Sequence, residues 1–275
     1  MGETILEVKD LSFAYRKDKE IFKNVSFTLN SGEIISIIGP NGTGKTTLIK
    51  CVLSLLKPQK GTVKVDGVNI KDMSHKERSR KISYVPQAGA MIFNYRVIDV
   101  LVIGRVSHFK GGGSASIKDI EIVNQVIADL EIEHLKYSQF NELSGGEKQM
   151  VYLARAIVQD AKIIIMDEPT SNLDYKNQIK ILKVLNDLAI KNYSIIMTSH
   201  FPEHALFLKT KALLLKGKRV FEYGEALDVI SSESLTSLYE TKIHVDAFKN
   251  KEDLITCTPI FGEALKGGNS NEKQN

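Results

Sequence analysis

The chain has 275 residues, 43% of them hydrophobic, which is enough to bury a sizeable core in one large domain or two modest ones. Its 37 basic residues are offset by 33 acidic residues, and the formal net charge of +4 gives no reason to expect a nucleic-acid partner. The two cysteines, Cys51 and Cys257, lie far apart without histidine or cysteine neighbours at metal-ligand spacing, so neither a zinc site nor a disulfide framework is expected.

The first elements in chain order are strands. Residues 1–10 lack the basic-then-apolar layout of a secretion signal, and a reducing cytoplasm fits the chain. Residues 5–15 and 21–29 partly alternate apolar with polar side chains on either side of a charged run, which predicts an antiparallel hairpin. Apolar runs too short to cross a bilayer as helices predict buried, mostly parallel strands at 33–38, 81–85, 163–167, 194–198 and 212–215. Any membrane role therefore has to come from a partner.

A helical segment is expected between two of these strands. Apolar residues recur at helical spacing through 120–130, inside a stretch of roughly 88–150 that we expect to be a helical subdomain. Its glycine-rich part, 111–116, predicts a flexible loop. The fold class is therefore α/β, with a mixed, mainly parallel core sheet, an N-terminal antiparallel β subdomain and a helical subdomain. We expect one domain over 1–240 and a C-terminal extension over 241–275, whose polar end has the composition of a disordered tail.

A complete phosphate-binding pattern, G-x-x-x-x-G-K-[ST], follows the apolar strand 33–38 and leads into a predicted helix over 47–56. Glycines suit such a loop because its backbone curls around phosphate oxygens with the N–H groups pointing inward, at a helix N-terminus. The lysine then neutralises the β- and γ-phosphates of ATP, and the hydroxyl after it ligates Mg²⁺. We expect the nucleotide to contact Gly39, Pro40, Asn41, Gly42, Thr43, Gly44, Lys45, Thr46 and Thr47. A glycine-rich turn that binds nothing is the alternative.

Two acidic residues end the apolar run 163–166. An open parallel sheet presents its ligand groups at the carboxyl ends of the strands, so Asp167 and Glu168 are placed to serve a bound nucleotide. Asp167 is expected to help hold Mg²⁺, and Glu168 to polarise the water that attacks the γ-phosphate. Alone the pair could be solvated acids, but beside an intact phosphate loop it indicates hydrolysis.

Residues 143–147, Leu-Ser-Gly-Gly-Glu, precede a predicted helix over 148–158. They fit a capping box, with Ser144 at the N-cap and Glu147 at the third helical position. A helix N-terminus that carries two glycines is also an anion site. The same residues can therefore cap the helix and grip a phosphate.

This stretch, upstream of Asp167, resembles the signature of the ATP-binding cassette (ABC) family, in a variant that ends in glutamate. The family's adenine-stacking aromatic, Q-loop glutamine, D-loop and switch histidine resemble, in that order, Tyr15, Gln87, Ser171 to Asp174, and His200. The resemblance covers roughly residues 5–225. Each motif has a structural alternative: a sheet aromatic, a polar turn residue, an N-cap for a helix over 175–190, and a histidine satisfied at a strand end.

The resemblance implies a P-loop NTPase of the ABC type that works as a homodimer. The catalytic residues that it implies are Glu168, His200, Lys45 and Gln87, and those around Mg²⁺ are Thr46, Gln87 and Asp167. In the family two chains sandwich two ATP molecules head to tail, and the signature residues Ser144, Gly145, Gly146 and Glu147 would reach the partner's nucleotide. Asp174 of the D-loop is also expected to bind nucleotide. The family further implies transmembrane permease subunits as partners, a solute-binding protein acting through them, and a peripheral position on the cytoplasmic face of the membrane.

Residues 102–108 resemble a Gly-Arg-x-Pro-His stretch of ATPases that serve importers of iron-siderophore, haem and cobalamin, with Ser107 in place of proline. Residues 201–205 and the signature's final Glu147 point the same way, so a metal chelate is the expected cargo. The alternative for the first stretch is a helix end capped by His108.

A different function is also open. A soluble ABC ATPase that moves no solute is the alternative, although the chain lacks the long heptad insertion, second nucleotide domain or strongly basic face of such proteins. A metabolic P-loop kinase would lack the signature.

Overall fold

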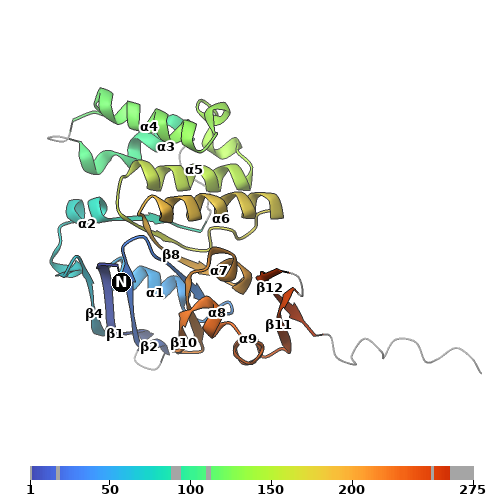
Figure 1. The fold of residues 1–275 in the computed structure, drawn as a ribbon. Coiled ribbons are helices and arrows are strands. Elements are labelled where there is room, and N and C mark those ends of the chain that lie inside the picture. Colours follow the sequence, from blue (N-terminus) through green and yellow to red (C-terminus); the bar gives the residue numbers. More distant parts are fainter. Residues whose placement is uncertain (1, 17–18, 88–93, 110–112, 249–250, 261–275) are drawn as a thin grey trace, which may run out of the picture.

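The computed structural model describes residues 2–16, 19–87, 94–109, 113–248 and 251–260. The first residues of the predicted helical subdomain, part of the predicted glycine-rich loop and the polar C-terminal end lie outside these ranges. The described residues form a layered α/β structure around a six-stranded sheet (Figure 1).

The central sheet has the strand order β10-β9-β3-β8-β7-β6. Its strands are β10 (Arg219–Glu225), β9 (Lys211–Lys216), β3 (Ile34–Ile38), β8 (Ser194–Ser199), β7 (Ile163–Met166) and β6 (Ile82–Val85). Neighbouring strands are parallel, except that β10 runs antiparallel to β9. The predicted parallel core is therefore confirmed, and its strands are apolar on both faces because both faces are covered.

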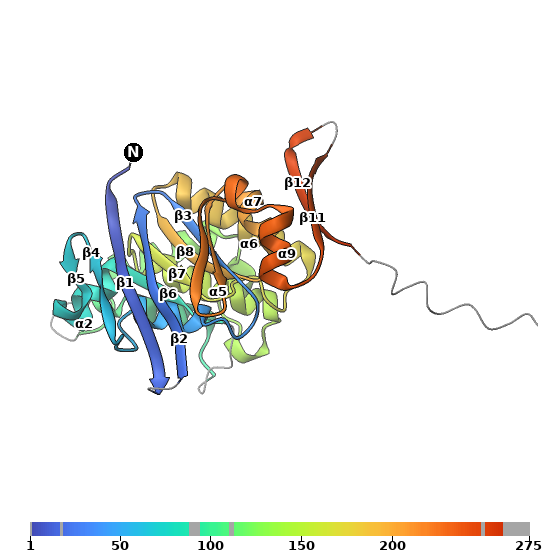
Figure 2. The same ribbon diagram turned by 90° about the horizontal axis from the view of Figure 1, so that it is seen from below.

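A second, antiparallel sheet and helix α1 (Lys45–Val52) cover one face of the central sheet (Figure 2). This sheet has the order β2-β1-β4-β5, with β1 (Thr4–Arg16), β2 (Lys19–Asn30), β4 (Lys60–Val65) and β5 (Val68–Asn69). One hydrophobic cluster joins Phe22 of β2 and Leu48 of α1 to Ile165 in the central sheet. The predicted N-terminal hairpin and antiparallel β subdomain are confirmed.

Helices cover the other face (Figure 1). They are α3 (Val97–Gly104), α4 (Ile117–Asp129), α5 (Gly145–Val158) and α6 (Tyr175–Ile190), with α2 (His75–Lys81) at the edge and 3₁₀ turns at Val106–His108, Glu133–Leu135 and Phe140–Glu142. A further 3₁₀ turn, Ile70–Asp72, follows β5 and packs with the antiparallel sheet through Ile70. The described part of the predicted helical subdomain contains helices and 3₁₀ turns, and the described residues of the predicted loop, 113–116, have no regular structure. The subdomain boundaries themselves stay a prediction.

The helix after the phosphate loop is shorter than the sequence predicts. It was expected over 47–56, whereas α1 runs from Lys45 to Val52. Ser54 adopts a left-handed conformation with φ of 57°, which a helix cannot continue through. The stop therefore lies several residues before Pro58, the residue on which the prediction relied.

The C-terminal part of the chain contains structure that the sequence did not predict. After β8 come α7 (Pro202–Leu208), α8 (Ala226–Val229), α9 (Ser232–Tyr239) and a hairpin of β11 (Ile243–Phe248) and β12 (Lys251–Pro259). A third hydrophobic cluster packs α7, α9 and the hairpin together. In none of the described ranges does a helix have the length and apolarity needed to span a membrane.

Residues 104–108 clamp α3 to α5. Gly104 lies so close to α5 that a Cβ would stand 2.8 Å from Val158 Cγ2. Arg105 Nη1 donates to the carbonyl of Val158 at 2.8 Å, and His108 Nε2 lies 2.8 Å from the carbonyl of Gln159. Both carbonyls lie at the C-terminal end of α5. His108 therefore caps a helix end, as the alternative for this stretch proposed, and the helix that it caps is α5.

A buried ion pair fixes the same clamp to α4. Arg105 Nε donates to Asp119 Oδ1 at 3.0 Å, and both side chains are almost fully buried. Hydrogen bonds from Ser116, supported by Arg105, lower the pKa of Asp119 to about 2. The depressed pKa means that the ionised form stabilises the fold above the carboxyl's ordinary pKa of 3.8, and that this stabilisation is lost as the pH falls through about 2.

Asp119→Asn should therefore lower the free energy of unfolding at pH 7 by about 2 kcal/mol, because the Arg105 charge stays buried without its counter-charge. The difference between variant and wild type should shrink as the pH falls from about 4 to about 2, which urea unfolding at a series of pH values measures. Asp99→Asn is the matched control, because Asp99 forms an exposed ion pair with Arg96 and its loss should cost less than about 1 kcal/mol. Equal effects of the two substitutions would contradict the role given to Asp119.

Candidate active site

The phosphate loop connects β3 to α1 and folds through conformations that glycine supports. Gly42 and Gly44 have φ of 81° and 96°, in the left-handed region. A Cβ on Gly44 would also stand 2.6 Å from Ile21 Cγ2, and a Cβ on Gly39 would collide with the carbonyl of Leu215. The pattern therefore has a structural reason at each of these glycines.

Lys45 is buried and turned back over its own loop. Its Nζ donates to the carbonyls of Gly39 at 2.7 Å and Pro40 at 3.1 Å, and lies 3.6 Å from Glu168 Oε1. Burial lowers the pKa of Lys45, and the nearby Glu168 opposes this shift. Phosphate oxygens inside the loop would give this ammonium stronger partners than two neutral carbonyls.

One threonine hydroxyl orders both acids at the end of β7. Thr198 Oγ1, on the adjacent strand β8, donates to Asp167 Oδ1 at 2.8 Å and accepts from the Glu168 N–H at 2.8 Å. Glu168 has φ of 49°, a conformation that is uncommon for a residue with a side chain and is held here by its surroundings. Thr198 was not among the predicted site residues, and its place at the end of the predicted strand 194–198 is the only sequence signal for it.

Three of the predicted catalytic side chains surround the fourth, Glu168. Gln87 Nε2 donates to Glu168 Oε2 at 3.2 Å, and His200 Nδ1 lies 3.8 Å from the same oxygen. Gln87 Nε2 also lies 3.4 Å from Ser171 Oγ, in the predicted D-loop. Within the described residues, His200 Nδ1 is buried and has no hydrogen-bond partner. The sheet order therefore brings together residues that lie far apart in the sequence.

The predicted magnesium ligands offer hard oxygen donors near the loop. Thr46 is the second residue of α1 and half-buried, and Asp167 is buried at the end of β7. The described residues contain no cluster of three or more histidine, cysteine or acidic side chains that could form a closed metal cage. Mg²⁺ usually keeps several waters and binds through one or two protein oxygens plus phosphate, so the donors present fit it.

Tyr15 lies on β1 beside the N-terminal end of α1. Its hydroxyl is 3.3 Å from Thr47 Oγ1, and its ring makes an edge contact with Phe13 at a centroid distance of 4.9 Å. The ring is nevertheless 57% exposed. Tyr15 is therefore an aromatic residue of the sheet, which was the alternative to an adenine-stacking residue. Its exposed ring surface also leaves room for a base to stack.

The signature residues form the predicted capping box. Ser144 Oγ accepts from the Glu147 N–H at 3.4 Å, and Glu147 Oε2 accepts from the Ser144 N–H at 2.8 Å. A Cβ on Gly145 would meet open space, whereas a Cβ on Gly146 would stand 2.6 Å from Asn177 Nδ2.

Asp174 is the N-cap of α6, which was the alternative to a D-loop role for this residue. Its Oδ1 accepts from the Asn177 N–H at 2.8 Å and its Oδ2 from Asn177 Nδ2 at 2.9 Å. The N-termini of α5 and α6 therefore meet at Asn177. Among the described residues, no hydrogen bond or ion pair joins 144–147 to the phosphate loop.

Comparisons with known proteins agree with this architecture. The ABC transporter family matches residues 22–171. The chain is 33% identical to the molybdate import ATP-binding protein of Haemophilus influenzae, covering 95% of this chain and 98% of the relative. It is 36% identical to a protein of Helicobacter pylori named "Probable iron chelatin transport ATP-binding protein", covering 90% and 97% of the two chains.

A solved structure described as a metal-chelate type ABC transporter in an inward-facing conformation superposes with a TM-score of 0.83 and 31% identity, over 94% of this chain and 99% of that one. The family match includes the phosphate loop, Gln87, residues 144–147, Asp167 and Glu168, and it ends before Thr198 and His200. The chain belongs to the ABC transporter family and is one of its ATP-binding subunits, which hydrolyse ATP.

Proposed function

We propose that this chain drives an importer of metal chelates by hydrolysing Mg-ATP at the site around Glu168. The observation that carries the hydrolytic part is the convergence of Lys45, Gln87 and His200 on that single carboxylate. A carboxylate at a strand end, next to a phosphate loop, is placed to take a proton from an attacking water.

Each residue of the site has a distinct task in this proposal. Lys45 neutralises the β- and γ-phosphates, and the loop N–H groups hold the phosphate oxygens. Thr46, Asp167 and Gln87 would hold Mg²⁺, which would neutralise phosphate charge when bound with the nucleotide. Glu168 orients and deprotonates the water. His200, whose Nδ1 has no hydrogen-bond partner among the described residues, donates to the γ-phosphate.

We further propose that two chains complete each site. ABC ATPase subunits work as dimers with transmembrane permease components, and the signature of this chain faces outward at Gly145. The phosphate loop leaves one side of the γ-phosphate open to water, where electrostatic stabilisation is weak. Ser144 and the N-terminus of α5 from the second chain would close that side.

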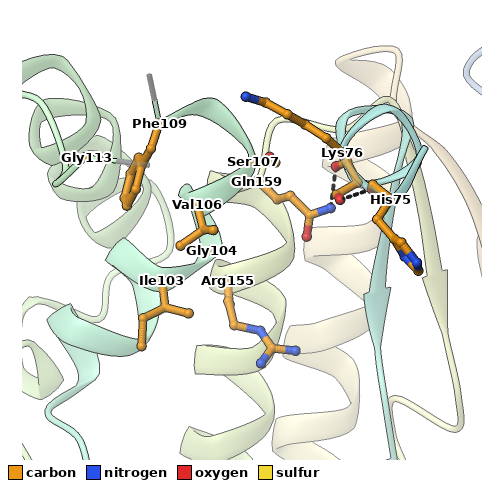
Figure 3. A pocket seen from close by; sticks show the side chains of 11 residues that line it. His75, Lys76, Ile103, Gly104, Val106, Ser107, Phe109, Gly113, Arg155 and Gln159 are labelled. Atoms are coloured by element: carbon orange, nitrogen blue, oxygen red, sulfur yellow. Dashed lines mark hydrogen bonds between the residues drawn. The ribbon is translucent and has the colours of Figure 1, made fainter. Parts of the chain in front are cut away.

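A groove on the helical layer is a suitable surface for the permease. It has a volume of about 710 Å³ and lies between α2, the α3 end and α5 (Figure 3). Ile103, Val106 and Phe109 line one side, and His75 and Lys76 line the other (Figure 3). We propose that a cytoplasmic segment of the permease binds here, which places the chain on the cytoplasmic face of the membrane.

The proposed cargo, a metal chelate, is supported by the names of similar proteins. The names of the Haemophilus and Helicobacter proteins refer to molybdate import and iron chelatin transport, and the solved structure is described as metal-chelate type. The stretch 104–108, by contrast, has a structural role in clamping α3 to α5. Nothing in these comparisons supports the ATPase that moves no solute.

Reconstitution tests the assignment. The chain, its copurifying membrane subunits and the solute-binding protein should give ATP-driven uptake of ferric siderophore, haem or cobalamin into proteoliposomes, and not of the oxyanion molybdate. The same complex carrying Glu168→Gln is the control and should give none. ATP-driven uptake of a sugar, amino acid or peptide, or export of any solute, would overturn the cargo while leaving the ATPase intact.

A further inference from the structure

The peptide that carries His200 is held from two sides. His200 lies between the end of β8 and the start of α7. On one side, Ser199 Oγ accepts from the Phe201 N–H at 2.9 Å. On the other, the Tyr239 hydroxyl donates to the His200 carbonyl at 2.8 Å. This second bond comes from the last residue of α9, which is 39 positions away in the sequence.

The Tyr239 hydroxyl is a dependable donor. Burial raises the pKa of Tyr239, so the hydroxyl keeps its proton throughout the physiological pH range. An acceptor left without its partner in a half-buried site costs free energy, which favours keeping the bond formed. The His200 backbone therefore follows the position of α9.

The C-terminal hairpin fixes α9 in turn. The Val245 N–H on β11 donates to Ser232 Oγ at 2.8 Å, and the Ile243 N–H donates to Thr236 Oγ1 at 3.0 Å. Leu235 and Leu238 of α9 belong to the hydrophobic cluster that also contains Ala205 and Leu206 of α7. Figure 2 shows α9 between the hairpin and the remainder of the molecule. The two ends of α9 are thus tied to the hairpin and to the peptide of His200.

We infer that Tyr239 is a positioning residue for His200, so that α9 and the C-terminal hairpin hold the histidine in register with Glu168. The inference rests on the proposed role of His200 in hydrolysis. It assigns a function to residues 231–259, which carry none of the nucleotide-binding motifs. Small displacements of a group that must meet a developing charge reduce turnover more than they reduce substrate binding.

Tyr239→Phe tests the inference, because it removes one oxygen and keeps the ring. We expect kcat for ATP hydrolysis to fall about 3- to 10-fold while KM for ATP changes less than about twofold. Tyr223→Phe is the matched control: the Tyr223 hydroxyl donates to the Thr28 carbonyl at 3.0 Å, between β10 and β2. It should lower the melting temperature comparably and leave kcat unchanged.

A second measurement separates positioning from a general loss of stability. In a His200→Ala background, Tyr239→Phe should not lower the residual single-turnover rate further, because the group that it positions is gone. An equal further loss in that background, a kcat within about twofold of wild type, or a Tyr239→Phe chain that does not fold would each overturn the inference. If His200→Ala itself hydrolyses ATP at the wild-type rate, the proposed role of His200 fails instead.

Discussion

Glu168→Gln should lower the rate of ATP hydrolysis at least about 100-fold while ATP still binds. The amide has the shape of the carboxylate and can still accept from Gln87, but it cannot take a proton from water. It also removes the negative charge 3.6 Å from Lys45, which leaves that ammonium free for the phosphates. Single-turnover hydrolysis measures the rate, and a fluorescent ATP analogue measures binding.

Glu33→Gln is the control for this substitution. Glu33 pairs with Lys211 just before the first residue of β3, at the opposite end of that strand from the phosphate loop. Its substitution also removes one carboxylate and should leave the single-turnover rate unchanged. A Glu168→Gln chain with near wild-type single-turnover hydrolysis would remove Glu168 from the role of general base.

Mixing two inactive variants should restore hydrolysis. Lys45→Ala removes the phosphate-loop charge, and Ser144→Arg blocks the signature that would face the partner's nucleotide. A mixed dimer has one site built from intact Lys45 of one chain and intact Ser144 of the other, beside one doubly damaged site. If dimers form at random and sites act independently, the mixture should reach about a quarter of wild-type activity.

The control is a chain that carries both substitutions, mixed with either single variant. No combination in that mixture places an intact Lys45 opposite an intact Ser144, so it should stay inactive. Differently tagged chains that copurify show that mixed dimers form. Absence of recovered activity in the presence of such dimers would contradict a site shared between chains.

The parts of this site that the sequence predicted are those encoded over short distances. The phosphate loop, the acids after β7 and the capping box at Ser144 each need fewer than ten consecutive residues, so local chemistry specifies them. The contacts of Gln87 and His200 with Glu168 depend on strands β6, β7 and β8 lying side by side, which only the sheet order establishes. Gln87 and His200 were predicted as site residues from the resemblance to the ABC family, because hydrophobic periodicity does not identify them.

Other features depended on long-range packing or on single backbone conformations. The left-handed Ser54 ends α1 early, and a serine does not predict that conformation as a glycine or asparagine would. Thr198 serves Asp167 and Glu168 across strands. The hairpin of β11 and β12 is stabilised by α7 and α9, to which it is bound through Ser232 and through a shared apolar cluster. The sequence pattern of residues 243–259 alone cannot reveal these contacts with α7 and α9.

Residues 103–108 contain two kinds of position: some contact α5, and others are exposed on the groove. Gly104, Arg105 and His108 contact α5, so a substitution at any of them is expected to destabilise the fold. Ile103 and Val106, interleaved with them, are 50% and 56% exposed on the groove. If the permease binds this groove as proposed, exchange of Ile103 and Val106 would adapt the chain to a new permease, while Gly104, Arg105 and His108 keep the fold unchanged.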